Sequence, residues 1–137
     1  KRSGNHMNQS PNILVADDES HILHVVGLKL RHAGYRVQLA VDGGQAYEAA
    51  IKQPPAMLIT DYQMPVMTGL ELCEKLRGHD CMRDMPAIML TARGFGLAEQ
   101  QMTDAGIVAS ISKPFSPREI LTRVEALIGQ ANRNRVA

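Results

Sequence analysis

The residues of this sequence that are best suited to chemistry are acids, a hydroxyl and a lysine, and each follows a short apolar segment. They are Asp17, Asp18, Asp61, Thr91 and Lys113. Taken singly, each has an ordinary structural explanation, because acids after strands often cap helices, threonine is common in strands and lysine is usually solvated. Together they would line one polar site, provided that the elements before them end at the same place.

The segments that precede these residues are typical of strands. Residues 12–16, 56–60 and 87–91 are short apolar runs, which suits strands buried on both faces. Residues 35–40 alternate between apolar and polar side chains like a further strand. Residues 108–112 give the weakest strand pattern of the five.

Helical patterns lie between these strands. The first has Ser20 as its predicted N-cap, and the second begins at the cap residue Asp42. The last is marked by a capping box of Ser116 and Glu119, and we expect it to end near Gly129. The expected helices span residues 20–33, 42–51, 70–77, 97–105 and 117–128.

The alternation of strands and helices predicts an α/β fold with a parallel sheet, since right-handed crossovers place helices on both faces of such a sheet. Ligands of these sheets bind at the carboxyl ends of the strands. All five polar residues would fall on this edge. The element order therefore predicts a single functional site there.

Length and composition favour one domain. The chain has 137 residues and is 45% hydrophobic, which is enough for one core and short for two ordinary domains. Apolar runs stay well below the ~18 residues of a membrane-spanning helix, so we expect a cytoplasmic protein that does not contact a membrane. Residues 1–6 are interpreted as an expression-tag remnant, residues 7–129 as the domain, and residues 130–137 as a polar tail or the start of a linker.

Charge and cysteine content exclude further classes of function. Four of the 15 Lys and Arg residues lie near the termini, which leaves 11 against 14 Asp and Glu. The body of the chain is mildly acidic, and we expect it not to bind nucleic acid directly. Cys73 and Cys81 lack the spacing of a zinc site and are too few for a disulfide framework, so reduced thiols in a cytosol are the better interpretation.

Several stretches, taken in order and spacing, resemble the receiver domains of two-component response regulators, including the stand-alone chemotaxis regulators. The resemblance covers residues 12–128, nearly the whole chain. It implies a flavodoxin-like fold with a doubly wound, five-stranded parallel sheet of order 2-1-3-4-5 flanked by five helices. The matching stretches are ILVADDE (13–19), DYQMP (61–65), MTG (67–69), LTA (90–92) and KPF (113–115).

The resemblance implies a signalling domain that catalyses only its own phosphorylation and dephosphorylation. Asp61 would be the phosphoacceptor, and its phosphoryl group would come from a sensor histidine kinase or a histidine phosphotransfer protein. Thr91 would donate its hydroxyl to the phosphoryl group, and Lys113 would neutralise phosphoryl charge. The downstream partner would be an unknown protein or an output domain that has been removed from this chain.

The resemblance also implies a magnesium site, with Mn²⁺ as an alternative ion. Three nearby carboxylates would repel one another and an incoming phosphate, and a hard divalent cation relieves both conflicts. Asp18, Asp61 and the main-chain carbonyl of Gln63 would be ligands, and Asp17 would act directly or through water. The bond between Lys113 and Pro114 is expected to be cis.

One position departs from the family pattern. Receiver domains usually carry Tyr or Phe three residues before the conserved lysine, where the ring rotates inward as the threonine moves, but this chain has Ser110. The chemical groups for phosphorylation are all present, so we expect phosphorylation itself to be retained. The signal would then pass through the fourth helix or the loop that follows Thr91.

Two alternatives remain open at this point. One is a receiver-like interaction module that works without phosphorylation, which Ser110 favours. The other, weaker alternative is an aspartyl-nucleophile phosphatase of the haloacid dehalogenase type. That family needs an acid two residues after the nucleophile, where this chain has Gln63.

Overall fold

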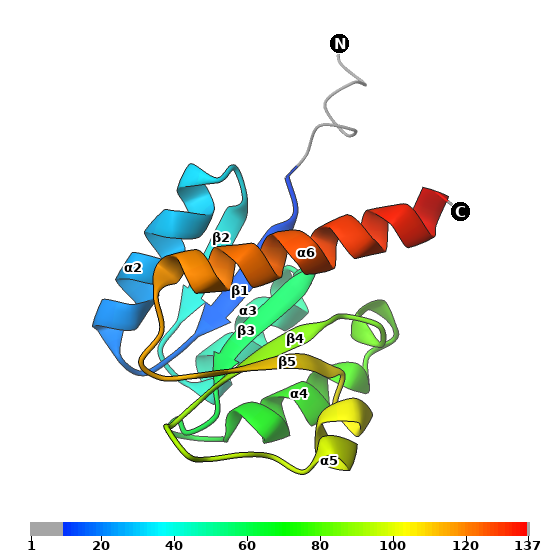
Figure 1. Cartoon of the computed structure of the whole chain (residues 1–137). Coiled ribbons are helices and arrows are strands. Elements are labelled where there is room, and N and C mark those ends of the chain that lie inside the picture. Colours follow the sequence, from blue (N-terminus) through cyan, green and yellow to red (C-terminus); the bar gives the residue numbers. More distant parts are fainter. Residues whose placement is uncertain (1–9, 137) are drawn as a thin grey trace.

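The computed structural model describes residues 10–136, so the predicted tag remnant at residues 1–6 lies outside the described residues. Strands and helices alternate along the chain (Figure 1). The strands are β1 (Asn12–Ala16), β2 (Arg36–Ala40), β3 (Met57–Asp61), β4 (Ala87–Thr91) and β5 (Ile107–Ser112). The helices are α2 (Ser20–His32), α3 (Gly43–Lys52), α4 (Gly69–Arg77), α5 (Glu99–Asp104) and α6 (Pro117–Val136), with a short 3₁₀ helix, η1 (Asp80–Met82).

The five strands form one parallel sheet in the order β2-β1-β3-β4-β5. This confirms the predicted fold class and strand order. The register pairs Ala16 with Thr60, and Asp61 with Leu90. Successive strands therefore end side by side, which brings the residues that follow them to one edge.

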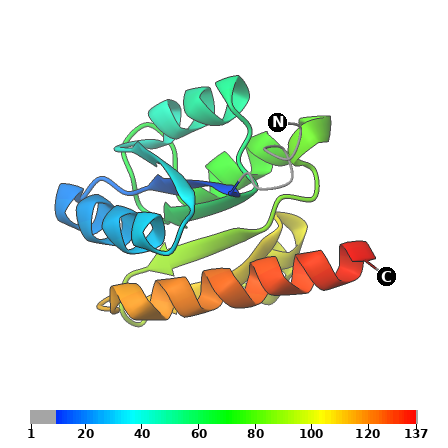
Figure 2. The same cartoon turned by 90° about the horizontal axis from the view of Figure 1, so that it is seen from above.

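Helices cover both faces of the sheet (Figure 2). Helices α2 and α6 lie against one face, where their apolar residues share a buried cluster with alternate residues of the central strands. Helices α3, α4 and α5 lie against the other face and pack on a second cluster. Because side chains of a strand alternate between faces, neighbours such as Ile13 and Leu14 belong to different clusters.

The three central strands are buried along their full length. This explains their continuous apolar sequences, since both faces of each strand are covered by helices. Strand β5 lies at the edge and alternates between buried and exposed residues. That alternation, which includes exposed Ser110, gave it the weakest sequence pattern.

Several predicted boundaries are wrong. Helix α2 begins at Ser20 itself, with Glu19 at the N-cap position, so Ser20 is not the cap. Helix α6 passes through Gly129 and continues to Val136 rather than ending there. A single glycine costs only about 1 kcal/mol inside a helix, which does not force it to end. Helix α5 is shorter than predicted, and η1 was not predicted at all.

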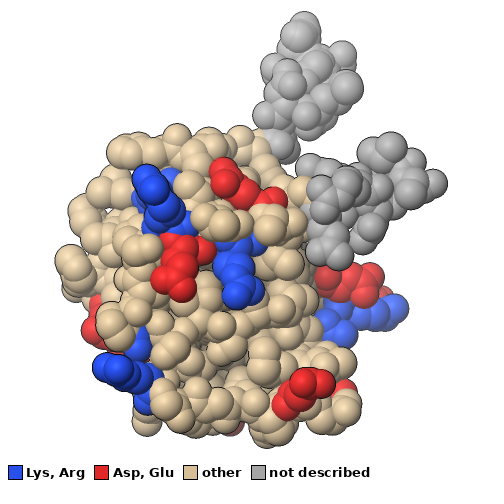
Figure 3. All heavy atoms as spheres, viewed as in Figure 1, with Lys and Arg blue, Asp and Glu red and all other residues tan. Residues whose placement is uncertain are grey.

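The surface shows no charge pattern that would mark a class of ligand on the face in view. Figure 3 shows acidic and basic side chains interspersed over that face of the described residues. Among residues 10–136, the helices are too short or too polar to cross a membrane.

Candidate functional site

Three carboxylates meet at the carboxyl edge of the sheet. Asp17 follows β1 and is completely buried, Asp61 ends β3 with 6% of its surface exposed, and Asp18 is exposed. One oxygen from each lies within 4.8 Å of the others. The strand register therefore brings together the acids that sequence analysis placed at this edge.

Local hydrogen bonds fix the buried acids in place. An oxygen of Asp17 accepts the main-chain N–H of Glu19 at 2.8 Å, so the turn after β1 closes on its own acid. The main-chain N–H of Asp17 donates to the carbonyl of Ala40 at 3.1 Å, which continues the pairing with β2. Beyond β3, the N–H of Gly69 donates to the carbonyl of Tyr62 at 2.7 Å and closes the loop that follows Asp61.

Lys113 is the cation of the site. Its Nζ lies 2.7 Å from Glu19 Oε1, 3.1 Å from Asp17 Oδ2 and 3.5 Å from Asp61 Oδ1. Its main-chain N–H donates to the carbonyl of Thr91 at 2.8 Å, which ties the residue to the end of β4. The peptide bond between Lys113 and Pro114 is cis, as the resemblance implied.

The electrostatics of the site favour a bound cation. Burial raises the pKa of Asp61 to about 6, and the neighbouring Asp17 carboxylate adds to this, while Lys113 opposes it. Burial also raises the pKa of Asp17. Burial disfavours the charged form of Lys113, but its bond to Glu19 and the nearby Asp carboxylates outweigh this and raise its pKa. One ammonium group is thus shared by several carboxylates, so the net charge of the site is negative.

One buried oxygen supports a metal ligand role. Asp17 Oδ2 has the Lys113 charge nearby, but among the described residues it has no partner in hydrogen-bonding geometry. A buried polar atom without a hydrogen bond is energetically costly, and a bound cation would provide the missing partner. Clustered carboxylate oxygens are the donors that Mg²⁺ prefers. The residues present therefore fit a hard divalent cation.

A cavity of about 370 Å³ opens over these groups. Gln63 and Lys113 line it together with Asp18 and Asp61, as expected. Thr91 does not line it: the residue is buried at the end of β4, and its neighbour Ala92 faces the cavity instead. The full lining is Asp18, Glu19, Asp61, Tyr62, Gln63, Ala92, Phe95 and Lys113.

Four residues that line this cavity, Glu19, Tyr62, Ala92 and Phe95, were not predicted as members of the site. Glu19 makes the shortest contact to Lys113, and its position directly after the acid pair was the available signal. Tyr62 and Phe95 both line the cavity, and their ring centroids lie 4.6 Å apart. Tyr62 follows the phosphoacceptor candidate directly, but no sequence pattern pairs it with a residue that lies 33 positions later.

Comparison with known proteins matches this arrangement. The family model for the response regulator receiver domain matches residues 13–125. The chain is 37% identical over 123 residues to the DNA-binding dual master transcriptional regulator RpaA of Synechocystis, covering 90% of this chain and 51% of that protein. The chain thus spans about half the length of the curated relatives it matches.

Solved structures agree. Chemotaxis response regulator CheY4 of Vibrio cholerae superposes with a TM-score of 0.80 at 31% identity, covering 86% of this chain and 98% of that one. The receiver domain of sensor histidine kinase PA1611 from Pseudomonas aeruginosa PAO1 has a TM-score of 0.77 at 30% identity, covering 88% and 98%. The latter has a magnesium ion coordinated in its active site cleft.

Proposed function

Because this chain belongs to the response regulator receiver domain family, we propose that Asp61 accepts a phosphoryl group in a magnesium-dependent reaction and that phosphorylation switches what the domain binds. The observation that carries this proposal is the grouping of Asp61 with Asp17, Asp18 and Lys113 around one cavity, which Asp18, Asp61 and Lys113 line and beneath which Asp17 is buried. Sequence positions far apart in the chain meet there with the groups that phosphoryl transfer requires.

Asp61 is the nucleophile in this proposal. One of its carboxylate oxygens attacks phosphorus, and the bond from phosphorus to the imidazole nitrogen of a donor phosphohistidine breaks, so the nitrogen leaves with the electron pair. The product is an aspartyl phosphate. Asp61 is suited to this role because it lines the cavity, whereas Asp17 is fully buried beneath it.

Asp17, Asp18, Asp61 and the main-chain carbonyl of Gln63 would hold the magnesium ion, with Mn²⁺ as an alternative. When bound, the ion would offset repulsion among the carboxylates and neutralise charge on the phosphoryl oxygens. The free oxygen of Asp17 and the negative excess of the site support this assignment.

Lys113 and Thr91 complete the proposed site. The Lys113 ammonium, 3.5 Å from Asp61 Oδ1, is placed to pair with a phosphoryl oxygen. The Thr91 hydroxyl would donate to another such oxygen. Because Thr91 does not line the cavity in this structure, that contact requires the end of β4 and the following loop to move toward Asp61. This movement is the proposed switch.

A second cavity supports a sensor histidine kinase or histidine phosphotransfer protein as the donor. An apolar groove of about 590 Å³ lies between the start of α2 and the loop before α6, and Ile22, Val25 and Phe115 line it. It shares Glu19, Ala92 and Lys113 with the acidic cavity. A helical donor seated in this groove would present its phosphohistidine directly beside Asp61.

The groove makes a separate prediction about the donor. Ile22→Ser should slow transfer from a phosphorylated histidine kinase without slowing phosphorylation by acetyl phosphate, which needs no docking surface. Val108→Ser, which replaces an exposed residue of β5 outside the groove, is the matched control. Equal slowing with both donors would contradict the docking role.

The output and location of the protein belong to this proposal as well. RpaA is a DNA-binding regulator about twice as long as the matched region, so a downstream domain or a separate protein partner would read the switch. We place the reaction in the cytoplasm, where reduced Cys73 and Cys81 are stable. Nucleic acid and membrane are not proposed as partners of these residues.

The direct test is intact mass spectrometry after incubation with acetyl phosphate and Mg²⁺. We expect one added phosphoryl group on the wild-type chain and none without Mg²⁺ or in Asp61→Asn. A wild-type protein that folds normally but takes no phosphoryl group would contradict the proposal and favour the interaction module that works without phosphorylation.

A further inference from the structure

We propose that the stacked rings of Tyr62 and Phe95 form a lid over the acidic cavity, and that this lid limits the entry of water and of small phosphodonors to Asp61. The inference rests on the proposed function and adds a control on the lifetime of the aspartyl phosphate. It concerns two residues to which the proposed phosphorylation chemistry gives no role.

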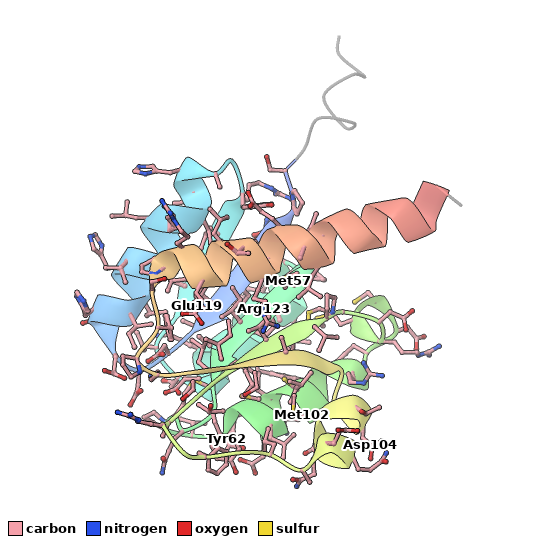
Figure 4. All side chains as sticks on the ribbon, in the orientation of Figure 1. Met57, Tyr62, Met102, Asp104, Glu119 and Arg123 are labelled. Atoms are coloured by element: carbon pink, nitrogen blue, oxygen red, sulfur yellow. The ribbon has the colours of Figure 1, made fainter. Side chains whose placement is uncertain are left out.

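The two rings come from segments that follow different strands. Tyr62 directly follows Asp61 at the end of β3, and Phe95 lies in the loop between β4 and α5. Their planes are tilted by 36° with centroids 4.6 Å apart, and both residues line the cavity. Figure 4 shows Tyr62 beside this loop. An aromatic pair thus lines a cavity whose other lining residues are largely charged.

Tyr62 is the fixed half of the pair. Its main-chain N–H donates to the carbonyl of Leu90 at 2.9 Å, and its carbonyl accepts the N–H of Gly69 at 2.7 Å. These bonds attach it to β4 and to the start of α4. Its ring also packs against the hydrophobic cluster on that face of the sheet.

Phe95 is the movable half. Its main-chain N–H donates to the carbonyl of Ala92 at 3.0 Å, and Gly94 between them has φ +81°, so residues 92–95 form a closed turn directly after Thr91. Beyond the turn, a side chain at Gly96 would meet open space. In this proposal the turn would move as a unit with the end of β4, and its movement would separate Phe95 from Tyr62.

Core packing does not explain the position of Phe95. The residue is 41% exposed and belongs to neither hydrophobic cluster, whereas Leu97 two positions later packs against one of them. A large ring left this exposed beside a charged cavity has one aromatic neighbour, Tyr62, among the described residues. The ring of Phe95 instead lines the cavity and contacts Tyr62.

The position of the rings beside Asp61 would affect hydrolysis of the aspartyl phosphate. Loss of the phosphoryl group requires a water oxygen to attack phosphorus while the bond to the Asp61 oxygen breaks, which restores the carboxylate and releases inorganic phosphate with the water's proton. Water and small donors would both reach Asp61 through the cavity that the two rings line. Apolar groups that exclude water from such a site slow both reactions.

The test compares two rates in Phe95→Ala and Phe95→Tyr: phosphorylation by acetyl phosphate with Mg²⁺, and loss of the phosphoryl group after the donor is removed. A lid predicts that Phe95→Ala raises both rates by about threefold or more, and that Phe95→Tyr keeps both near wild type. Gly96→Ala, in the same loop but away from the rings, should change neither. Damage to the chemical groups would instead lower the phosphorylation rate.

Unchanged or lowered rates in Phe95→Ala, or equal effects of Phe95→Ala and Phe95→Tyr, would overturn the lid while leaving phosphorylation of Asp61 intact. A wild-type protein without phosphorylation would contradict the proposed function instead. In that case the lid is tested by fluorotyrosine NMR, in which the Tyr62 signal can be compared with those of Tyr35 and Tyr47. In Phe95→Ala, the H₂O/D₂O solvent isotope shift of the fluorine signal must increase for Tyr62 and stay the same for Tyr35 and Tyr47. An unchanged shift for Tyr62 would overturn the lid.

Discussion

The two halves of the carboxyl edge of the sheet are built differently. At the ends of β1 and β3, Asp17 and Asp61 are buried, and Gly69 packs so closely that an added Cβ would overlap the main-chain oxygen of Asp61. At the end of β4, residues 92–96 are exposed, and side chains at Gly94 and Gly96 would meet open space. The first half holds groups in place, and the second has room to move.

In the proposed function, this difference separates the phosphorylation chemistry from the conformational response. Carboxylates that hold an ion and a nucleophile need fixed geometry, which dense packing provides. A switch needs an element with few contacts to break, and such elements come from the less stable parts of a fold. Lys113 joins the halves, since its side chain contacts the acids and its main chain bonds to Thr91.

The largest effect on stability is expected for Lys113→Met. Removing the cation leaves buried Asp17 without its counter-charge, which should lower the free energy of unfolding by about 3 kcal/mol at neutral pH without metal. The carboxyl pKa values rise further in the variant, so the loss should shrink as the pH falls and the acids become neutral. Urea unfolding at several pH values measures this.

Lys52→Met is the control, because Lys52 is an exposed lysine at the end of α3. Its substitution should change the free energy of unfolding by less than about 0.5 kcal/mol. A similar small change for Lys113→Met would show that the cation does not hold the fixed half together.

Gly69→Ala should give the next largest effect. The added methyl group would press on the main chain of Asp61 and on Met89 Sδ, 3.0 Å away. Overpacking of this kind should lower the free energy of unfolding by about 2 kcal/mol. Thermal unfolding of the variant measures the loss, and a wild-type transition would show that the fixed half is looser than its packing indicates.

The raised pKa of Asp61 predicts that one substitution stabilises the protein, in contrast to the two above. Its folded value of about 6 exceeds the ordinary 3.8, so the folded state loses stability as the pH rises through this interval. Asp61→Asn removes the charge and should raise the free energy of unfolding by about 1–2 kcal/mol at pH 7 without metal. The gain should vanish near pH 4, where the wild-type carboxyl is protonated in the folded state.

Mg²⁺ gives a second test of the comparison between the wild-type protein and Asp61→Asn. It should stabilise the wild-type protein at pH 7, because an ion that binds only the folded state shifts the equilibrium toward it. It should have much less effect on Asp61→Asn. An Asp61→Asn variant less stable than wild type at pH 7 would contradict the account of repulsion among the acids.

The smallest effects are expected in the loose half. Gly96→Ala has open space and no positive φ, so its free energy of unfolding should stay within about 0.5 kcal/mol of wild type. Gly94→Ala must adopt φ +81° and should cost about 1 kcal/mol. Differential scanning fluorimetry on the pair separates backbone strain from packing. A loss for Gly96→Ala as large as that for Gly69→Ala would remove the contrast between the halves.

Much of the fold could be predicted from the sequence because local and global signals agree. The central strands are apolar throughout because helices cover both their faces, and the predicted capping box of Ser116 and Glu119 begins α6. Predictions from the local sequence were wrong where tertiary contacts determine the local structure. Ser20 does not cap α2 because the turn before it is closed by Asp17, which accepts the N–H of Glu19.

The site was predictable in its residues and less so in its contacts. Asp17, Asp18, Asp61 and Lys113 lie together because parallel strands end at one edge, which the order of elements already indicates. Two contacts were not predictable: Thr91 does not line the cavity, and Tyr62 stacks on Phe95. The second contact depends on the path of the glycine-containing loop after β4. Loop paths follow from packing over long sequence distances, which a local pattern does not encode.

The central claim, that a fixed half performs the chemistry and a loose half responds, is tested most directly by amide chemical shifts with and without Mg²⁺ and beryllium fluoride as a phosphoryl mimic. We predict that shifts beyond the cavity concentrate in residues 91–98 and in α5, while β1 and the buried part of β3 change little. Binding of the mimic with no shifts beyond the cavity would contradict the switch.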